Sequence, residues 1–282
     1  MVSFRYHVIS LAAALLALAV GIVVGTTSLS ATPAPVKAPA VAVATDTSGE
    51  DLAHRVQSRL LRNALPDQRV LLLLTPDVPS GAARTVVAAV RSAGSTVTAQ
   101  VQLQPTLLDA SGTQTVDGVV TGTAPASLRL PSTGTLERAG ALLAATFVTS
   151  GQGSDVTGVA QQKVLGGFTG GSLIAIDGPL PSARATLVLV LSGPARGPSL
   201  ATLAAAFQER VGTVVAATPA AARGRGVVAV LRSRSTGVSD VDDLGTSVGL
   251  LGTVLALGEQ ASGGAGHYGT GPRADGVVPA LG

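Results

Sequence analysis

The sequence predicts an α/β protein in which a single N-terminal membrane helix precedes a body built on a mostly parallel sheet. Three observations support this fold class. The body contains short, fully apolar segments, which are typical of buried parallel strands. Segments with helical spacing of apolar residues alternate with these strands. A pattern of strand, loop, helix and strand also returns about 117 positions later, which indicates two related βαβ lobes.

The first 29 residues predict a membrane anchor. Residues 8–24 are dominated by apolar side chains, and no Lys, Arg, Asp or Glu occurs between Arg5 and Lys37. With its flanks, this stretch forms about 30 Å of helix, enough to cross a bilayer core. A cleaved secretory signal is the alternative, although its apolar core is usually only about 7–15 residues long. The charge distribution places the N-terminus in the cytoplasm and the body outside it.

The predicted anchor carries a stripe of small residues at every fourth position. Such a stripe lies along one side of a helix and lets two helices approach closely. In a chain so rich in alanine it could also arise by chance. Packing of anchors in a homo-oligomer is therefore a hypothesis that rests on Ala13, Ala17, Gly21 and Gly25.

A tether connects the anchor to the body. Residues 30–49 are rich in Pro, Ala, Thr and Ser, and closely spaced prolines exclude a helix there, so we expect an extended segment. The body spans residues 50–282, with 50–150 and 151–282 as candidate lobes. An amphipathic helix that ends at Pro66 opens it.

The body then alternates strands and helices. Its first unit has a strand at 70–74, a helix at 82–93 and a strand at 96–103. Gly94 marks the end of the helix, because glycine commonly follows the last helical turn. The other expected elements are strands at 173–176, 186–191, 213–217 and 227–231, and helices at 136–148, 155–165, 199–211 and 244–260.

The composition excludes several classes of site. The chain has no Cys and one Met, the initiator, so disulfides, iron–sulfur clusters, thiolate zinc sites and thioether ligands for Cu(I) are excluded. The net charge is only +3 and aromatic residues make up 2% of the chain, which argues against nucleic-acid binding. There is no G-x-S-x-G motif and there are only three histidines, so we expect neither an enzyme nor a bound cofactor.

The glycine-rich loop at 192–199 invites comparison with phosphate-binding loops. It matches neither G-x-x-x-x-G-K-[ST] nor G-x-G-x-x-G, and Pro194 and Pro198 lack the amide donors that a phosphate needs. We therefore interpret this loop as a structural turn.

Two polar segments near the C-terminus supply the candidate metal ligands. Residues 240–243 read Asp-Val-Asp-Asp and offer oxygen ligands, but these carboxylates could instead cap the helix expected from Leu244. The later turn His-Tyr-Gly-Thr-Gly offers an imidazole for Cu(II) or Zn(II), or it packs locally. The candidate ligands, with these alternatives open, are Asp242, Asp243 and His267.

Both ends of the chain resemble one family. The head reads SFRYHVISLA and then LALAVGIVVG, and the tail carries VDD, VLAL and GHYGTG. Together with the segments at 69–77 and 93–98, these motifs resemble the actinobacterial copper transporter MctB family over nearly the whole chain. The resemblance implies an envelope protein of copper efflux and copper resistance, with copper as the transported ion. It also implies an oligomeric, pore-forming protein of the outer membrane.

The sequence leaves two functions open. The first is the copper-export role that the resemblance implies, with the membrane, the copper ion and other copies of the chain as partners. The second is a non-catalytic, membrane-tethered α/β module that binds or scaffolds envelope partners. The lack of recognisable reaction chemistry favours this alternative.

Overall fold

The computed structural model describes residues 59, 61–79, 81–132, 134–149, 155–178 and 183–280. The predicted anchor at 1–29, its small-residue stripe and the tether at 30–49 lie outside the described residues, as does most of the helix expected before Pro66. Within the described ranges, no helix combines the length and the apolar character that spanning a bilayer requires. The anchor and the tether stay predictions.

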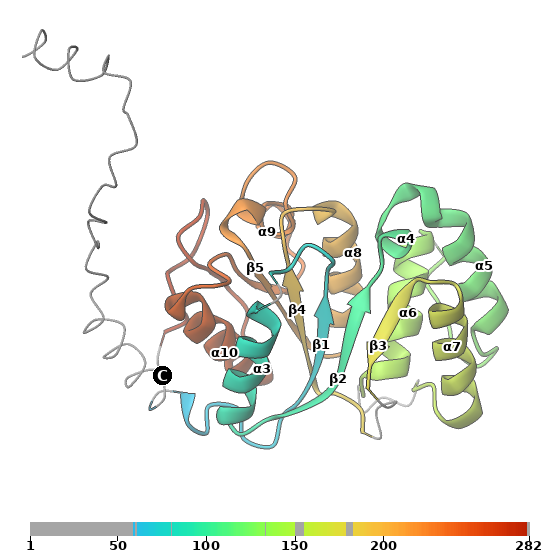
Figure 1. Cartoon of the computed structure of the whole chain (residues 1–282), viewed down its shortest axis with the longest axis horizontal. Coiled ribbons are helices and arrows are strands. Elements are labelled where there is room, and N and C mark those ends of the chain that lie inside the picture. The colour runs from blue at the N-terminus through green and yellow to red at the C-terminus, as the bar shows by residue number, and fades with distance from the viewer. Residues whose placement is uncertain are drawn as a thin grey trace, which may run out of the picture. The chain divides into compact units, whose positions relative to one another are not determined.

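Seven strands form one sheet in the order β3-β2-β1-β4-β5-β6-β7 (Figure 1). All neighbouring strands are parallel except β2 and β3, which are antiparallel. The α/β class with a mostly parallel sheet is therefore confirmed. The strands are β1 (Arg69–Leu74), β2 (Thr96–Leu103), β3 (Ile174–Asp177), β4 (Leu187–Ser192), β5 (Gly212–Ala217), β6 (Ser239–Val241) and β7 (His267–Tyr268).

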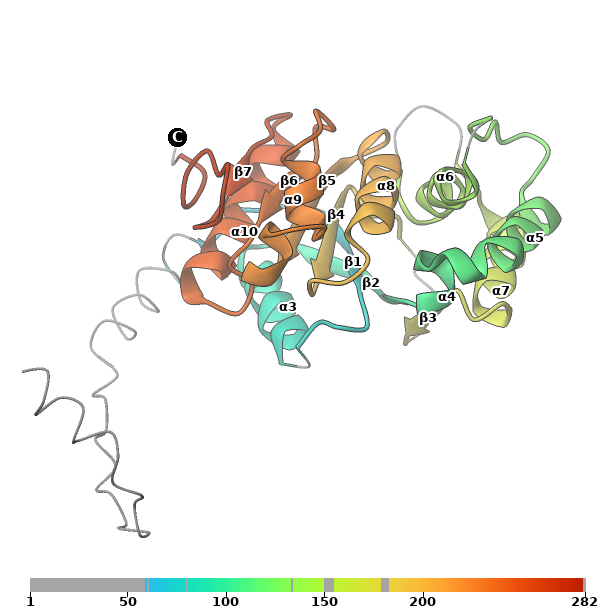
Figure 2. The ribbon, with the colours of Figure 1, turned by 90° about the horizontal axis from the view of Figure 1, so that it is seen from above.

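Helices cover both faces of the sheet (Figure 2). Helices α3 and α10 pack on one face, and α6, α8 and α9 pack on the other. Helices α5 and α7 pack against α6, and α7 also contacts β3. The helices are α3 (Ala82–Ser92), α4 (Pro105–Leu108), α5 (Thr113–Thr123), α6 (Thr135–Phe147), α7 (Gly158–Gly170), α8 (Gly197–Gln208), α9 (Val227–Leu231) and α10 (Ser247–Ala261), with 3-10 turns η1 (Ala110–Gly112) and η2 (Pro219–Ala222).

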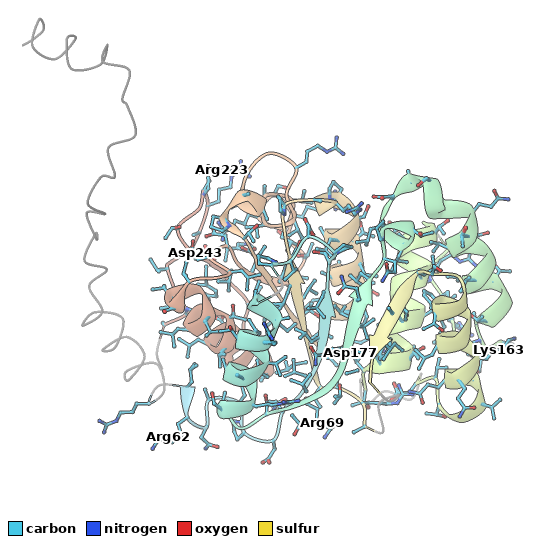
Figure 3. All side chains as sticks on the ribbon, in the orientation of Figure 1. Arg62, Arg69, Lys163, Asp177, Arg223 and Asp243 are labelled. Carbon is cyan, nitrogen blue, oxygen red and sulfur yellow. The ribbon has the colours of Figure 1, made fainter. Side chains whose placement is uncertain are left out.

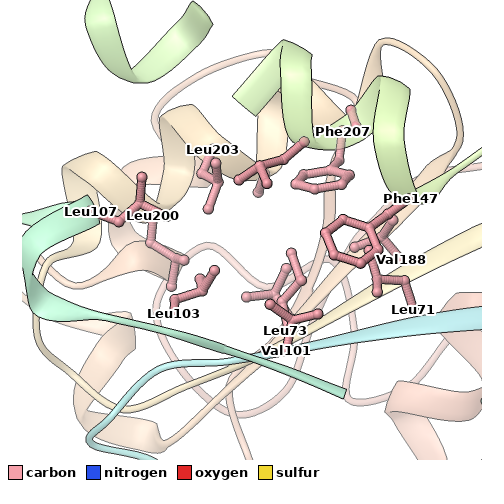
Figure 4. Close-up of a cluster of buried hydrophobic side chains, with 14 of the residues drawn as sticks. Leu71, Leu73, Val101, Leu103, Leu107, Phe147, Val188, Leu200, Leu203 and Phe207 are labelled. Carbon is pink, nitrogen blue, oxygen red and sulfur yellow. The ribbon is translucent and has the colours of Figure 1, made fainter. Parts of the chain in front are cut away.

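The sheet separates two apolar cores, because successive side chains of a strand point to opposite faces. Leu71 and Leu73 of β1 belong to the same buried cluster as Phe147 of α6 and Phe207 of α8 (Figure 4). Leu72, between the two leucines, belongs to the core under α3 and α10. Strands β1 and β4 are covered on both faces, which explains their unbroken apolar sequences.

The predicted strand at 227–231 is wrong, because these residues form helix α9. A five-residue apolar run fits either a strand or a buried helix, and periodicity does not distinguish the two. Val227, Val228 and Leu231 are buried at helical spacing, whereas Val230 is only partly buried. The position next to β5 belongs to β6, which the sequence analysis did not predict.

The remaining predicted elements of the described body are present, with shifted ends. Helix α10 begins at Ser247 because the hydroxyl of Thr246 accepts a hydrogen bond from the amide of Gly249 at 2.9 Å. The alternative in which the carboxylates at 240–243 cap this helix is therefore wrong. Helices α4 and α5 and the short strands β6 and β7 were not expected from the sequence.

Both edges of the sheet are short. Strand β7 has two residues, and a β-bridge between Tyr268 and Gly276 covers its outer side. The amide of Gly269 donates to the carbonyl of Gly276 at 2.9 Å beside this bridge. At the other edge, β3 has four residues and contacts α7.

Candidate functional site

Four ionisable side chains converge at the β6–β7 edge of the sheet. Arg232 follows the last turn of α9, Asp240 lies in β6, Asp242 follows β6 and His267 begins β7. Asp240 and Asp242 share one face of the sheet because side chains alternate along a strand, and Val241 between them enters the opposite core. His267 is in register with Asp240. These four ionisable residues are termed the edge cluster.

Arg232 connects most of the edge cluster. Its Nε donates to Asp240 Oδ1 at 2.8 Å, and a terminal nitrogen lies 2.7 Å from Asp242 Oδ2. The guanidinium also donates to the backbone carbonyls of Tyr268 and Pro272, at 2.7 and 2.8 Å. The side chains of Arg232 and the two aspartates are at most 1% exposed. Buried charges of this kind are tolerated only when they are paired and hydrogen-bonded.

His267 supplies a second cation to the edge cluster when it is protonated. Its Nδ1 lies 2.6 Å from Asp240 Oδ2, and its side chain is 28% exposed. The hydrogen bond to Asp240 raises the pKa of His267, with further support from the charges of Asp240 and Asp275, against burial and Arg232. Two carboxylates and one guanidinium leave one excess negative charge, which the imidazolium neutralises.

Burial also shifts the pKa values of two other groups near this edge. Burial raises the pKa of Asp240, whereas contacts with His267 and Arg232 lower it. Tyr268 faces the opposite core and donates its hydroxyl to Glu259 Oε2 at 2.7 Å. Burial and this carboxylate together raise the pKa of the Tyr268 phenol. The edge is thus held by charge pairing on one face and by a buried phenol on the other.

Asp242 and Asp243 fix the turn after β7. The amides of Thr270 and Gly271 donate to the two oxygens of Asp242 at 3.0 Å each, and the Thr270 hydroxyl donates to Asp243 Oδ1 at 2.9 Å. Gly269 has a φ of +122°, and a Cβ atom there would collide with the Asp242 carboxylate. The turn needs glycine at this position for both reasons.

The structure places the three predicted metal ligands in one region but gives them different partners. Asp242 binds Arg232 and backbone amides, Asp243 accepts from a hydroxyl, and the imidazole pairs with Asp240. Across the described ranges, no group of three or more His, Asp or Glu side chains is arranged to hold a metal ion. The metal assignment of Asp242, Asp243 and His267 stays a prediction.

Sequence reasoning missed Arg232 and the pairing role of Asp240. The spacing of Asp240 and Asp242 could have predicted such a partner. Two carboxylates that are two residues apart in a strand share one face of the sheet, and when buried they require a cation nearby. This signal becomes visible only when residues 239–241 are recognised as a strand. The partner Arg232 was hidden because its preceding segment was interpreted as a strand.

A second polar centre lies between β1 and β4, where the helical connections change faces. In doubly wound sheets, ligands bind at this point, outside the carboxyl ends of the strands. Here Asp77 Oδ2 accepts the amide of Ala195 at 2.8 Å, and the amide of Gly193 donates to the Thr75 hydroxyl at 3.3 Å. These two amides of the loop at 192–199 therefore have partners within the chain, and residues 197–199 form the first turn of α8.

Comparison of the sequence with known proteins gives matches over nearly the whole chain. The family model described as "Copper transport outer membrane protein, MctB" matches residues 1–279. Proteins named copper transporter MctB from Mycobacterium tuberculosis (strain ATCC 25618 / H37Rv) and Mycobacterium bovis are each 30% identical to this chain. The alignment is 312 residues long and covers 99% of both chains. The protein of the same name from Mycobacterium leprae is 29% identical over 324 residues, also with 99% coverage of both chains.

Proposed function

The chain belongs to the MctB family of copper transport outer membrane proteins, and from this membership we propose that it acts in copper transport at the cell envelope. The observation that carries the proposal is the extent of the match, from residue 1 to residue 279. It includes the predicted anchor as well as the edge cluster. The mycobacterial relatives that carry the name copper transporter also match over 99% of their length.

Cellular copper in cells that lack the gene tests this proposal. We expect deletion to raise copper content and copper sensitivity, and we expect the full chain to restore both. A chain without residues 1–30 should fail to restore them, because it lacks the only segment proposed to enter lipid. Unchanged copper content and unchanged growth in copper-containing medium after deletion would refute the transport role.

The topology belongs to the same proposal. A single anchor within residues 1–29 places the N-terminus in the cytoplasm and the body outside, as the charges around the anchor favour. Because the chain has no Cys, a cysteine introduced by substitution is its only thiol. A thiol reagent that does not cross the cytoplasmic membrane should label Ser127→Cys, on an exposed loop of the body, in intact cells. It should label Ser3→Cys only after permeabilisation, and the reverse pattern would refute this orientation.

Self-association through the small-residue stripe is the proposed route to an oligomer. A bulky side chain at Gly21 would separate two anchors that pack through this stripe. We expect Gly21→Leu to reduce the cross-linked oligomer in membranes and any copper conductance of the purified full chain. Ala19→Leu adds the same side chain away from the stripe and serves as the control. Equal effects of the two substitutions would refute packing through the stripe.

The proposed role involves copper as cargo and no catalytic step. The matched relatives are named transporters. In the described body, the charged groups of the edge cluster are engaged with one another and with backbone groups. Copper that co-purifies with the full chain at a fixed ratio, and resists dialysis, would contradict the cargo role.

A further inference from the structure

A hollow lined by three arginines lies where the parallel strands end. Its volume is about 440 Å³, and its walls come from the segments that follow β2, β4 and β5. Figure 3 shows Arg223 at this end of the molecule, toward which the strand arrows of Figure 1 point. Ligands of doubly wound sheets bind on this side. The hollow is termed the arginine hollow and is defined by Asp109, Arg196, Ser199, Arg223 and Arg225.

Two of the three guanidinium groups of the arginine hollow have no partner among the described residues, whereas Arg196 is paired with Asp109 and also lies in the field of Asp77. Arg196 binds Asp109 with two hydrogen bonds, from Nε at 2.6 Å and from a terminal nitrogen at 3.0 Å. This pairing lowers the pKa of Asp109, so the two charges cancel. Arg223 and Arg225 are exposed, and neither guanidinium has an ion-pair or hydrogen-bond partner among the residues that the structure describes.

The backbone that carries these two arginines is packed against its surroundings. The amide of Gly226 donates to the carbonyl of Arg223 at 3.0 Å, which closes a turn around Gly224. A Cβ atom on Gly226 would collide with the backbone of Ala221, and one on Gly197 would collide with the carbonyl of Arg225. The turn is therefore fixed against the start of α8, and Arg223 and Arg225 both line the arginine hollow.

These features favour an anion whose oxygens can accept hydrogen bonds from two unpaired guanidinium groups. A guanidinium presents paired donors that match the oxygens of a phosphate, and two of them neutralise its dianion. A copper cation would be repelled, so this site is independent of the transport role. The amides of Gly193 and Ala195 do not contribute, because Thr75 and Asp77 already accept them. We propose that the arginine hollow binds a phosphate group, either as free phosphate or as a phosphomonoester headgroup.

Calorimetric titration of the full chain in an uncharged detergent tests this proposal. The probes are inorganic phosphate and dihexanoyl phosphatidic acid below its micelle concentration. We expect saturable binding of one phosphate group per chain. The double substitution Arg223→Gln and Arg225→Gln should weaken binding at least about tenfold, because each charge-assisted contact is lost. Arg91→Gln with Arg129→Gln removes the same charge from exposed positions elsewhere and should leave the affinity within about twofold.

The outcomes separate the alternatives. Tighter binding of the lipid than of inorganic phosphate identifies a headgroup as the ligand, and equal binding identifies phosphate itself. Both results support the site when the Arg223 and Arg225 substitutions weaken the binding at least about tenfold. Equal losses in the two double variants would overturn the proposal, because overall charge would then explain the binding. The absence of saturable heat with either probe would overturn it as well.

Discussion

Replacing Arg232 with methionine tests how strongly the edge cluster stabilises the body. The substitution keeps much of the side-chain volume but removes the charge that pairs Asp240 with Asp242, both of which are at most 1% exposed. Breaking a buried ion pair from one side costs about 3–5 kcal/mol, because the remaining charges lose their partner. The carbonyls of Tyr268 and Pro272 also lose a donor. We expect the free energy of unfolding to fall by about 3–5 kcal/mol.

Urea unfolding of the full chain in an uncharged detergent, followed by circular dichroism, measures this loss. Arg234→Met is the control, because Arg234 lies two positions away and is exposed. Its effect should stay within about 0.5 kcal/mol. Adding Asp240→Asn and Asp242→Asn to Arg232→Met should recover part of the loss, since no unpaired charge then remains buried. Similar stabilities of Arg232→Met and Arg234→Met would refute the reasoning.

Three further predictions concern the same edge. Because the pKa of His267 is raised in the folded state, its protonation stabilises the fold. This contribution is complete below about pH 6.5 and disappears as the pH rises through the pKa of His267 in the folded protein. His267→Gln should therefore reduce the change in the midpoint of urea unfolding as the pH rises above about 6.5, and a pH dependence equal to that of the unsubstituted chain would contradict this. Thr246→Ala should lower the free energy of unfolding by about 0.5–2 kcal/mol through loss of the α10 cap, whereas Thr246→Ser should retain most of it. Gly269→Ala should cost at least about 1 kcal/mol in the same assay, because φ is +122° and the new Cβ meets Asp242, and a neutral result would show that the turn relaxes freely.

The centre of the sheet could be predicted from the sequence because local and long-range preferences agree there. Val70 to Leu74 is an unbroken apolar run, and the structure buries β1 between β2 and β4. Helix α3 shows apolar residues at helical spacing and ends before Gly94, whose φ is +93°. Each signal lies within about a dozen residues, so no knowledge of distant contacts was needed.

Elements that depend on distant partners could not be predicted. Helix α5 reads TQTVDGVVTGT, a sequence rich in threonine and glycine, which are poor helix formers. It buries only Val116 and Val120, and it is held by packing against α6 and α7. Strands β6 and β7 are three and two residues long, so neither shows a recognisable period.

The candidate site shows the same limit. Its residues Asp242, Asp243 and His267 were singled out by their chemistry, and the structure places all three at one edge. The pairing of His267 with Asp240 depends on the register of β6 and β7, which are separated by a helix and a turn. The arginine hollow was missed because its cations and its walls come from three separate loops.

The two ends of the sheet limit how copies of the body can meet. An open strand edge exposes unpaired amides and carbonyls, to which a strand of a neighbouring chain can add. Here β7 offers only two residues and is already bridged to Gly276, and β3 offers four. Such short edges provide little template for a shared intermolecular sheet. The same shortness protects the body against growth of β-fibres from its edges.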